Sequence, residues 1–463
     1  MNINSLRALP LGYFEYNQVL KPKNHLNTSQ PSHTLQQEPK LPGYNSYLSF
    51  HPSFGYYPKS TIDALKFQEN SPMYKFESSD IFDDIPNSYE RIFYGKQANI
   101  LGAGAIFSNF LKLGETIDFY YDKNSGEIGI FDPKLLQIDE IHQEYKGYNI
   151  LKGLDDIENG VVYIISPNKF HTPQINALSK NQSLNGIYTD KPICISRKEL
   201  AELENTVKTS KTPLYFGDFF FFSQLPALRL MGVKMPYKEA VTIQFDDSKD
   251  KKFSNSIKKA KAFYTPDEIK NIICKTIEHG AEDFEKRKWL KDKSEGGGVI
   301  LDLQVHISNL LNLMGLELTD INYVSAEKFK DTKFSAVHKN EAEDRAVIKG
   351  RLNKKIPVYM ETAQYMKNRE TYILIEGKDG NKIKISTDVF DKKTELLDKE
   401  NNVIARAYTV PRPYSLMIHH AQTCFDDPKT KDIPMFFDVQ RKTMKQLFTI
   451  KDIIDEQIEN NSY

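Results

Sequence analysis

Asp302 and His306 lie four positions apart in an apolar segment, "EGGGVILDLQVH" (295–306). In a helix this spacing puts both side chains on one face and within reach of each other. A carboxylate beside an imidazole fixes the ring's orientation, which is how a general base is held ready to take a proton from a hydroxyl. The alternative is an ordinary pair on a helix surface, but the apolar neighbours favour burial. We therefore expect Asp302 to orient His306 as a base.

A second candidate is Lys191, in the segment "TDKP" (189–192). It follows a predicted strand, and Pro192 makes the turn rigid. A lysine at the carboxyl edge of a parallel sheet faces the ligand site, where an ammonium group can polarise a substrate oxygen as charge develops. The alternative is an ordinary surface lysine.

The segment "ILGAGAIFSNF" (100–110) predicts a dinucleotide site, because two glycines follow a strand and open a helix. Gly102 permits the tight turn, and Gly104 lets backbone amides approach a pyrophosphate. Asp122, at the end of the next predicted strand, is placed to accept hydrogen bonds from a ribose diol, which favours NAD over NADP. The alternative is a glycine pair without function. Three further residues complete this predicted cofactor set: Ala105, Ile106 and Lys123.

The elements that must position these residues fall into two groups. From 96 to 222, strands alternate with helices, which is typical of a parallel Rossmann sheet with helices on both faces. From 223 to 463 we expect an α/β domain with a large, mostly antiparallel sheet. Strands are expected at 98–101, 116–122, 161–166 and 214–222, and helices at 265–290 and 302–315.

Residues 1–95 form a predicted N-terminal extension. Up to about residue 43 it is polar and rich in proline, a composition that buries too little surface to order itself. The following part is rich in aromatic residues, which are costly to leave in water. We expect that part to dock on the body of the protein or on a second subunit.

Composition narrows the class of protein. The 463 residues include 62 Lys and Arg and 62 Asp and Glu, so the net charge is zero and the basic footprint of a nucleic-acid-binding protein is absent. Hydrophobic residues make up 40%, which suits a globular protein, and no apolar run is long enough to cross a bilayer. The three cysteines have neither metal-ligand nor disulfide spacing, so we expect buried thiols, no metal site and a cytoplasmic location.

Together these segments resemble the glucose-fructose oxidoreductase / inositol dehydrogenase / rhizopine catabolism (Gfo/Idh/MocA) family. The resemblance covers roughly Gln97 to the C-terminus, and Asp190, Gln304 and Asn309 stand where Glu, Gly and Asp are usual. The motifs that carry it occur in the family's order: "LGAGAI" (101–106), "SPNKFH" (166–171), "DKP" (190–192), "WLKDKSEGGGVILDLQVH" (289–306) and "EDRA" (343–346).

The resemblance implies a Rossmann domain followed by an α/β domain with a large, mostly antiparallel open sheet. It implies NAD- or NADP-dependent oxidation or reduction of a hydroxyl-bearing carbon on a sugar, polyol or related compound, in a homo-oligomer (dimer or tetramer) formed through the C-terminal domain sheet. Two alternatives stay open: an NAD-dependent glycosidase and an inactive dinucleotide-binding regulator. By position, the implied catalytic set is Lys191, Asp302 and His306, and the residues implied beside the nicotinamide are Ser166, Pro167, Asn168, His171, Asp190 and Lys191.

Overall fold

The structure is a computed structural model of the chain, and part of the chain is described. Contacts divide the chain into two compact units, 1–57 and 58–463, and every described residue lies in the second. The predicted N-terminal extension lies outside the described residues. Those residues are 97–103, 128–137, 145, 147–245, 251–278, 288–328, 342–388, 392–409 and 413–460.

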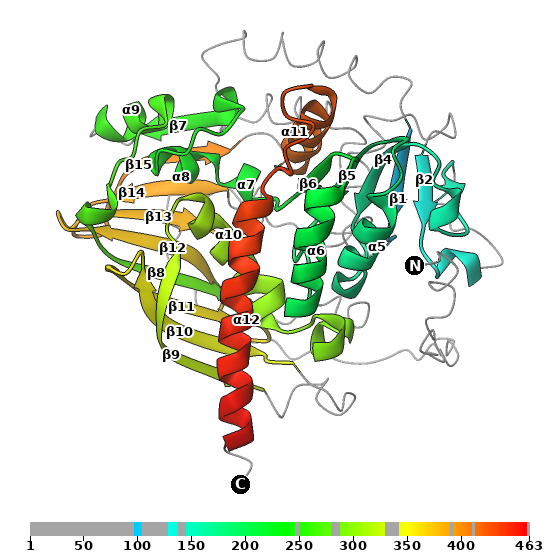
Figure 1. The fold of residues 1–463 in the computed structure, drawn as a ribbon. Helices are drawn as coiled ribbons and strands as arrows, with labels where there is room; N and C mark the ends of the chain where they lie inside the picture. The colour runs from blue at the N-terminus through cyan, green and yellow to red at the C-terminus, as the bar shows by residue number, and fades with distance from the viewer. Residues whose placement is uncertain are drawn as a thin grey trace, which may run out of the picture. The chain divides into compact units, whose positions relative to one another are not determined.

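Sheet A is a parallel sheet of the Rossmann type, as the sequence predicts (Figure 1). The strand order is β3-β2-β1-β4-β5-β6, and the residues of the central strands β1 and β4 are all buried, as in a sheet covered on both faces. The elements are β1 (Ala98–Leu101), β2 (Ile128–Phe131), β3 (Asn149–Ile150), β4 (Gly160–Ile164), α5 (His171–Leu178), β5 (Leu184–Thr189), α6 (Arg197–Thr209) and β6 (Leu214–Phe216).

Strand β2 lies beside β1 in the described part of sheet A. β1 pairs with β2 (Ile128–Phe131) on one side and with β4 on the other. The acid at the carboxyl end of β2 is Asp132. The sequence of β2 contains Gly129, which weakens a strand pattern, whereas 116–122 is rich in β-forming residues. Residues 116–122 themselves lie outside the described part.

Sheet B is large and antiparallel except where β8 pairs with β11. This agrees with the predicted fold class. The strand order is β7-β15-β14-β13-β12-β8-β11-β10-β9. The strands are β7 (Val241–Phe245), β8 (Ile269–Ile277), β9 (Leu318–Glu327), β10 (Arg345–Leu352), β11 (Ile356–Ala363), β12 (Glu370–Gly377), β13 (Lys382–Ser386), β14 (Lys393–Leu397) and β15 (Val403–Thr409).

Two predicted elements are wrong. The helix expected over 265–290 begins with a capping box at Thr265, but only one 3-10 turn follows, and β8 then runs through the middle of sheet B. Burial in a sheet outweighs the helix-start signal here. The strand expected over 214–222 ends at Phe216, because the Asp218 side chain accepts a hydrogen bond from Phe220 N and a helical turn follows.

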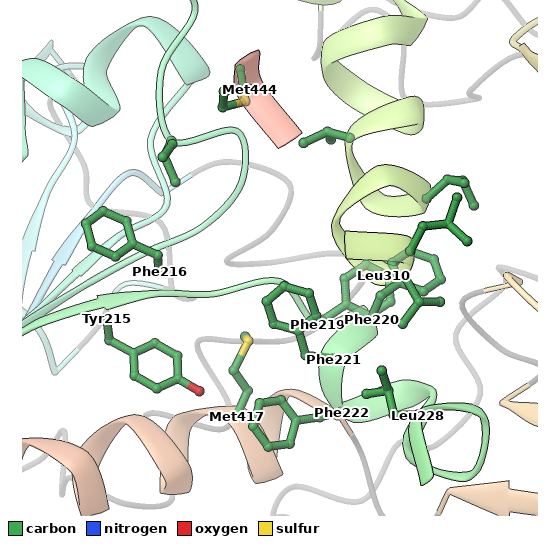
Figure 2. Packing of buried hydrophobic residues seen from close by; sticks show 14 of the residues in the cluster. Tyr215, Phe216, Phe219, Phe220, Phe221, Phe222, Leu228, Leu310, Met417 and Met444 are labelled. Atoms are coloured by element: carbon green, nitrogen blue, oxygen red, sulfur yellow. The ribbon is translucent and has the colours of Figure 1, made fainter. Parts of the chain in front are cut away.

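Helices connect and cover the two sheets. The Phe219–Phe222 side chains pack with Tyr215, Leu310 and Met417 in one apolar cluster (Figure 2). The glycine triplet is followed by a π-helix and then an α-helix rather than one α-helix. The helices are α7 (Phe220–Ser223), α8 (Leu225–Leu230), α9 (Lys251–Lys259), η12 (Ile300–Gln304, the π-helix), α10 (Val305–Leu313), α11 (Pro413–Asp426) and α12 (Phe437–Asn460).

The edge strand β6 is covered by a distant part of the chain. Met435 N donates to Leu214 O, and Phe216 N donates to Met435 O, both at 3.1 Å. The three cysteines are buried and free, as expected. Among the described residues, none of the helices combines the length and the apolar character needed to cross a membrane.

Candidate active site

Lys191 and Asp302 meet, although 111 positions separate them. Lys191 lies just beyond the carboxyl end of β5, and Asp302 lies in the π-helix η12. Lys191 Nζ donates to Asp302 O at 2.8 Å and to Asp302 Oδ1 at 3.3 Å. Their side chains are only 12% and 8% exposed. The ion pair therefore joins the parallel sheet to the segment that follows the glycine triplet.

His306 is held at Nδ1 by Asp218, a partner other than the expected Asp302. Asp218 Oδ1 lies 2.8 Å from His306 Nδ1, and Asn309 Nδ2 donates to Asp218 Oδ2 at 2.8 Å. Asp218 is completely buried at the turn between β6 and α7. The spacing argument considered only neighbours within one helix, whereas this partner follows strand β6 of sheet A.

The surroundings of His306 favour a neutral imidazole. Burial lowers the pKa of His306, and the nearby Asp218 carboxylate offsets only part of this effect. Burial opposes ionisation of Asp218, but the hydrogen bonds from His306, Asn309 and Phe220 N favour the carboxylate, and its pKa is lowered overall. An ionised Asp218 can only accept a hydrogen bond, so we infer that His306 Nδ1 carries the proton and donates it to Asp218. The lone pair of His306 Nε2 is then available as a base.

Asp190, beside Lys191, is a second buried carboxyl group. Its Oδ1 accepts from Lys191 N at 2.8 Å, and its Oδ2 accepts from Tyr414 Oη at 3.3 Å. Burial raises the pKa of Asp190 to about 7, although the Lys191 charge opposes the shift. Tyr414 belongs to α11, so the loop that carries Lys191 is tied to this helix as well.

The glycine triplet packs closely against several parts of the chain. Asn168 Nδ2 donates to Gly296 O at 2.9 Å, and Gly298 N donates to Leu290 O at 2.8 Å. Gly298 has φ +98°, and a Cβ there would lie 2.5 Å from Glu343 Oε1. Glycine is required at that position by both backbone conformation and space. The triplet thus lets the backbone before Asp302 lie against the Asn168 turn.

His171 and Ser166 have structural contacts in the predicted nicotinamide region. The two ring nitrogens of His171 lie 2.7 Å from Ser166 O and Pro192 O, and the ring is buried. Ser166 Oγ donates to Gln174 Oε1 at 2.7 Å. His171 therefore joins the turn after β4 to the turn that carries Lys191. The adjacent Pro167 is half-buried.

Part of the predicted dinucleotide loop is described. Gly102 has φ +107°, and a Cβ there would lie 2.7 Å from Ser166 Cα, so close approach requires glycine. Ala103 N donates to Asp132 Oδ2 at 2.9 Å, which places the acid that ends β2 beside this loop. Five predicted cofactor residues lie outside the described part of the chain: Gly104, Ala105, Ile106, Asp122 and Lys123.

The sequence analysis missed Asp218, Asp132 and Gln364. Gln364 Nε2 donates to Asp302 Oδ2 at 3.0 Å. Asp218 carries the same signal that singled out Lys191, because it is a charged residue just beyond a strand of the parallel sheet, in front of four phenylalanines. Gln364 has no such signal, since it meets Asp302 only through the folding of sheet B.

Solved structures of sugar oxidoreductases are similar to this chain. An aldose-aldose oxidoreductase from Caulobacter crescentus has a TM-score of 0.55 at 14% identity, over 78% of this chain and 98% of that chain. A levoglucosan dehydrogenase has a TM-score of 0.55 at 13% identity, over 78% and 97%. A UDP-N-acetylglucosamine 3-dehydrogenase from Acidithiobacillus ferrooxidans has 0.53 at 12%, over 78% and 98%. The chain shares their fold.

This likeness confirms the fold that the Gfo/Idh/MocA resemblance implies. No protein-family model and no curated protein sequence matches the chain. Because identity is 14% or less in these three comparisons, function has to be argued from the site itself.

Proposed function

We propose that the chain is a nicotinamide-dependent oxidoreductase that transfers hydride between the cofactor and a hydroxyl-bearing carbon of a sugar, polyol or related compound. The observation that carries this proposal is the convergence of Lys191, Asp302 and the His306–Asp218 pair beyond the carboxyl ends of β5 and β6. Ligands of open α/β sheets bind at that edge. The compared proteins are described as oxidoreductases or dehydrogenases, which favours hydride transfer over the glycosidase alternative.

The described residues fit a dinucleotide. At Gly102 the turn after β1 lies so close to the turn after β4 that no side chain would fit. Asp132 follows the last residue of β2, the strand beside β1. Asp132 Oδ2 accepts from Ala103 N and Oδ1 from Lys134 N, yet each carboxylate oxygen can accept a further hydrogen bond. We propose that Asp132, rather than Asp122, accepts hydrogen bonds from the ribose diol and that its charge favours NAD over NADP.

In this proposal the bound nicotinamide supplies hydride exchange at its ring, and the chain's own residues handle the proton. His306 Nε2 takes the proton of the substrate hydroxyl, and Asp218 stabilises the imidazolium that forms. The Lys191 ammonium lies against the reacting oxygen and stabilises its developing negative charge, while Asp302 holds that ammonium in place. The chain has all four of these ionisable residues, which favours an enzyme over the inactive regulator.

The test begins with a panel of sugars, polyols, their phosphates and nucleotide sugars, assayed with NAD and with NADP. Lys191→Met and His306→Asn should each lower turnover by on the order of a hundredfold or more, while cofactor affinity stays nearly unchanged. Lys208→Met, which removes an exposed lysine of α6, serves as the matched control. If both site variants keep most of the wild-type rate, the proposed mechanism is wrong.

We also propose that sheet B forms an interface between two copies of the chain. In β12 the side chains alternate, with Ile373 and Ile375 fully buried and Leu374 half-buried on the opposite face beside Ile273 of β8. Part of the charge on that face is paired within the sheet, as in Lys275–Glu370, and Lys384 lies over the Tyr372 ring. A half-apolar face whose charges are partly neutralised suits contact with an identical face.

A further inference from the structure

The corner after β11 has a strained backbone. Tyr365 has φ +64°, in the left-handed region that a bulky residue rarely adopts. Strained conformations cost free energy and persist where the surrounding structure fixes them, often at functional sites. The residue before Tyr365 is Gln364, whose side chain reaches Asp302.

Gln364 and Lys191 hold the two oxygens of one carboxylate. The Gln364 amide donates to Asp302 Oδ2 at 3.0 Å, and Lys191 Nζ lies 3.3 Å from Asp302 Oδ1. The two donors come from different sheets, because Lys191 follows β5 of sheet A and Gln364 follows β11 of sheet B. A carboxylate held at both oxygens cannot turn about its last side-chain bond without losing one partner.

The corner is itself fixed by a buried ion pair. Gln364 N donates to Asp344 O at 2.9 Å, and Lys291 Nζ contacts Asp344 Oδ1. The Lys291 and Asp344 side chains are 7% and 5% exposed. The Lys291 ammonium also lies 4.3 Å from the centre of the Tyr365 ring, a cation–π distance. Breaking a buried pair is costly, so this support holds the strained corner in place.

We propose that Gln364 is a positioning residue, which holds the Asp302 carboxylate against Lys191 so that the ammonium stays beside the reacting oxygen. The inference rests on the proposed function, since it assigns Gln364 a task in that reaction. Gln364 touches Asp302 and acts through it. Without the amide, the carboxylate is free to turn and the ammonium loses a fixed counter-charge.

The first experiment needs no substrate. The full-length protein is treated with a limiting amount of acetic anhydride at one fixed pH, and peptide mass spectrometry gives the rate at which Lys191 is acetylated. Gln364→Ala should raise this rate by roughly threefold or more, since a carboxylate that can turn holds the lysine side chain less firmly. Gln446→Ala is the matched control: it removes a half-buried glutamine of α12 that donates to Leu318 O. An unchanged Lys191 acetylation rate in Gln364→Ala overturns the inference.

The second experiment uses the substrate identified by the panel. Gln364→Ala should lower kcat about tenfold with cofactor affinity unchanged, and Gln446→Ala should leave both as in wild type. Gln364→Glu, which replaces the donor by a second carboxylate, should also lower kcat. If Lys191→Met is inactive but Gln364→Ala keeps the wild-type rate, only the positioning inference fails. If Lys191→Met keeps its rate, the proposed function fails, and the labelling rate still decides whether Gln364 holds the Asp302 carboxylate.

Discussion

At the scale of single residues, Asp218 determines which nitrogen of His306 is basic. Its carboxylate accepts from Nδ1 at 2.8 Å, and its complete burial keeps water from competing for that bond. An asparagine at the same position can turn its NH2 group to the ring, which favours the tautomer whose Nε2 carries the proton. Shape is kept in such a variant while the base is lost.

We therefore expect Asp218→Asn to lower turnover by on the order of a hundredfold or more without weakening cofactor binding. Oxidation needs neutral His306, so the rate falls as pH drops through the pKa of that residue. The Asp218 charge raises this pKa, and removing it should move the acidic limb of the rate profile to lower pH. A pH profile of kcat/KM measures the shift; an unmoved limb would contradict the pairing.

Asp190 gives a stability prediction, because its pKa is raised to about 7 in the folded chain, chiefly by burial. The unfolded chain has an ordinary value of about 4, so it loses its proton first as pH rises. Between these values Asp190 progressively destabilises the fold. Asp190→Asn should match wild type near pH 4, become more stable than wild type as pH rises to 7, and keep that advantage above. Urea unfolding of both proteins across this pH range tests the prediction. A difference in unfolding free energy that does not change with pH would be incompatible with the raised pKa of Asp190.

At the scale of elements, the glycine triplet allows the chain to pack closely. The effect of a side chain at its last residue, Gly298, can be compared with the effect at Gly315. Gly298 and Gly315 both have positive φ, but a Cβ on Gly315 would meet nothing within 4 Å. Gly315→Ala should cost about 1–2 kcal/mol from backbone strain alone. Gly298→Ala should cost a further 1–3 kcal/mol or so, because the methyl group collides with Glu343. Chemical denaturation measures the free energy of unfolding of both variants. Equal losses of stability would mean that the Glu343 side chain moves aside at little cost.

Elements were predictable from sequence where local pattern and tertiary setting agree. The alternation from β4 to α6 is apparent in its buried apolar runs and in the Ser196 cap, whose side chain accepts from Glu199 N. The β8 strand was not predictable, since its start signal belongs to a helix and only its neighbours β11 and β12 make it a strand. Local spacing likewise identified Asp302 and His306 as candidates. It could not identify Asp218, because that contact forms only when the turn after β6 packs against helix α10.

At the scale of the whole molecule, the outer face of sheet B gives a prediction about assembly. Leu374→Arg places a charge in the middle of this face, beside Ile273. In sedimentation-velocity experiments we expect the wild-type chain to run as the proposed oligomer and Leu374→Arg to run as a monomer, because an interface core does not tolerate an unpaired charge. Leu136→Arg is the control, since Leu136 is 47% exposed and belongs to the segment after β2. The same oligomer in both variants would rule out this face.

The cover on strand β6 has a consequence for how the chain is made. The ribosome completes β6 long before it adds Met435, whose backbone bonds to Leu214 and Phe216. Until then this edge of sheet A presents unpaired donors and acceptors to any neighbouring chain. A truncated chain that ends before Met435 therefore keeps β6 as an unpaired edge strand that can pair with other chains. We expect such fragments to aggregate or to need a chaperone, whereas the longer chain closes the edge with its own backbone.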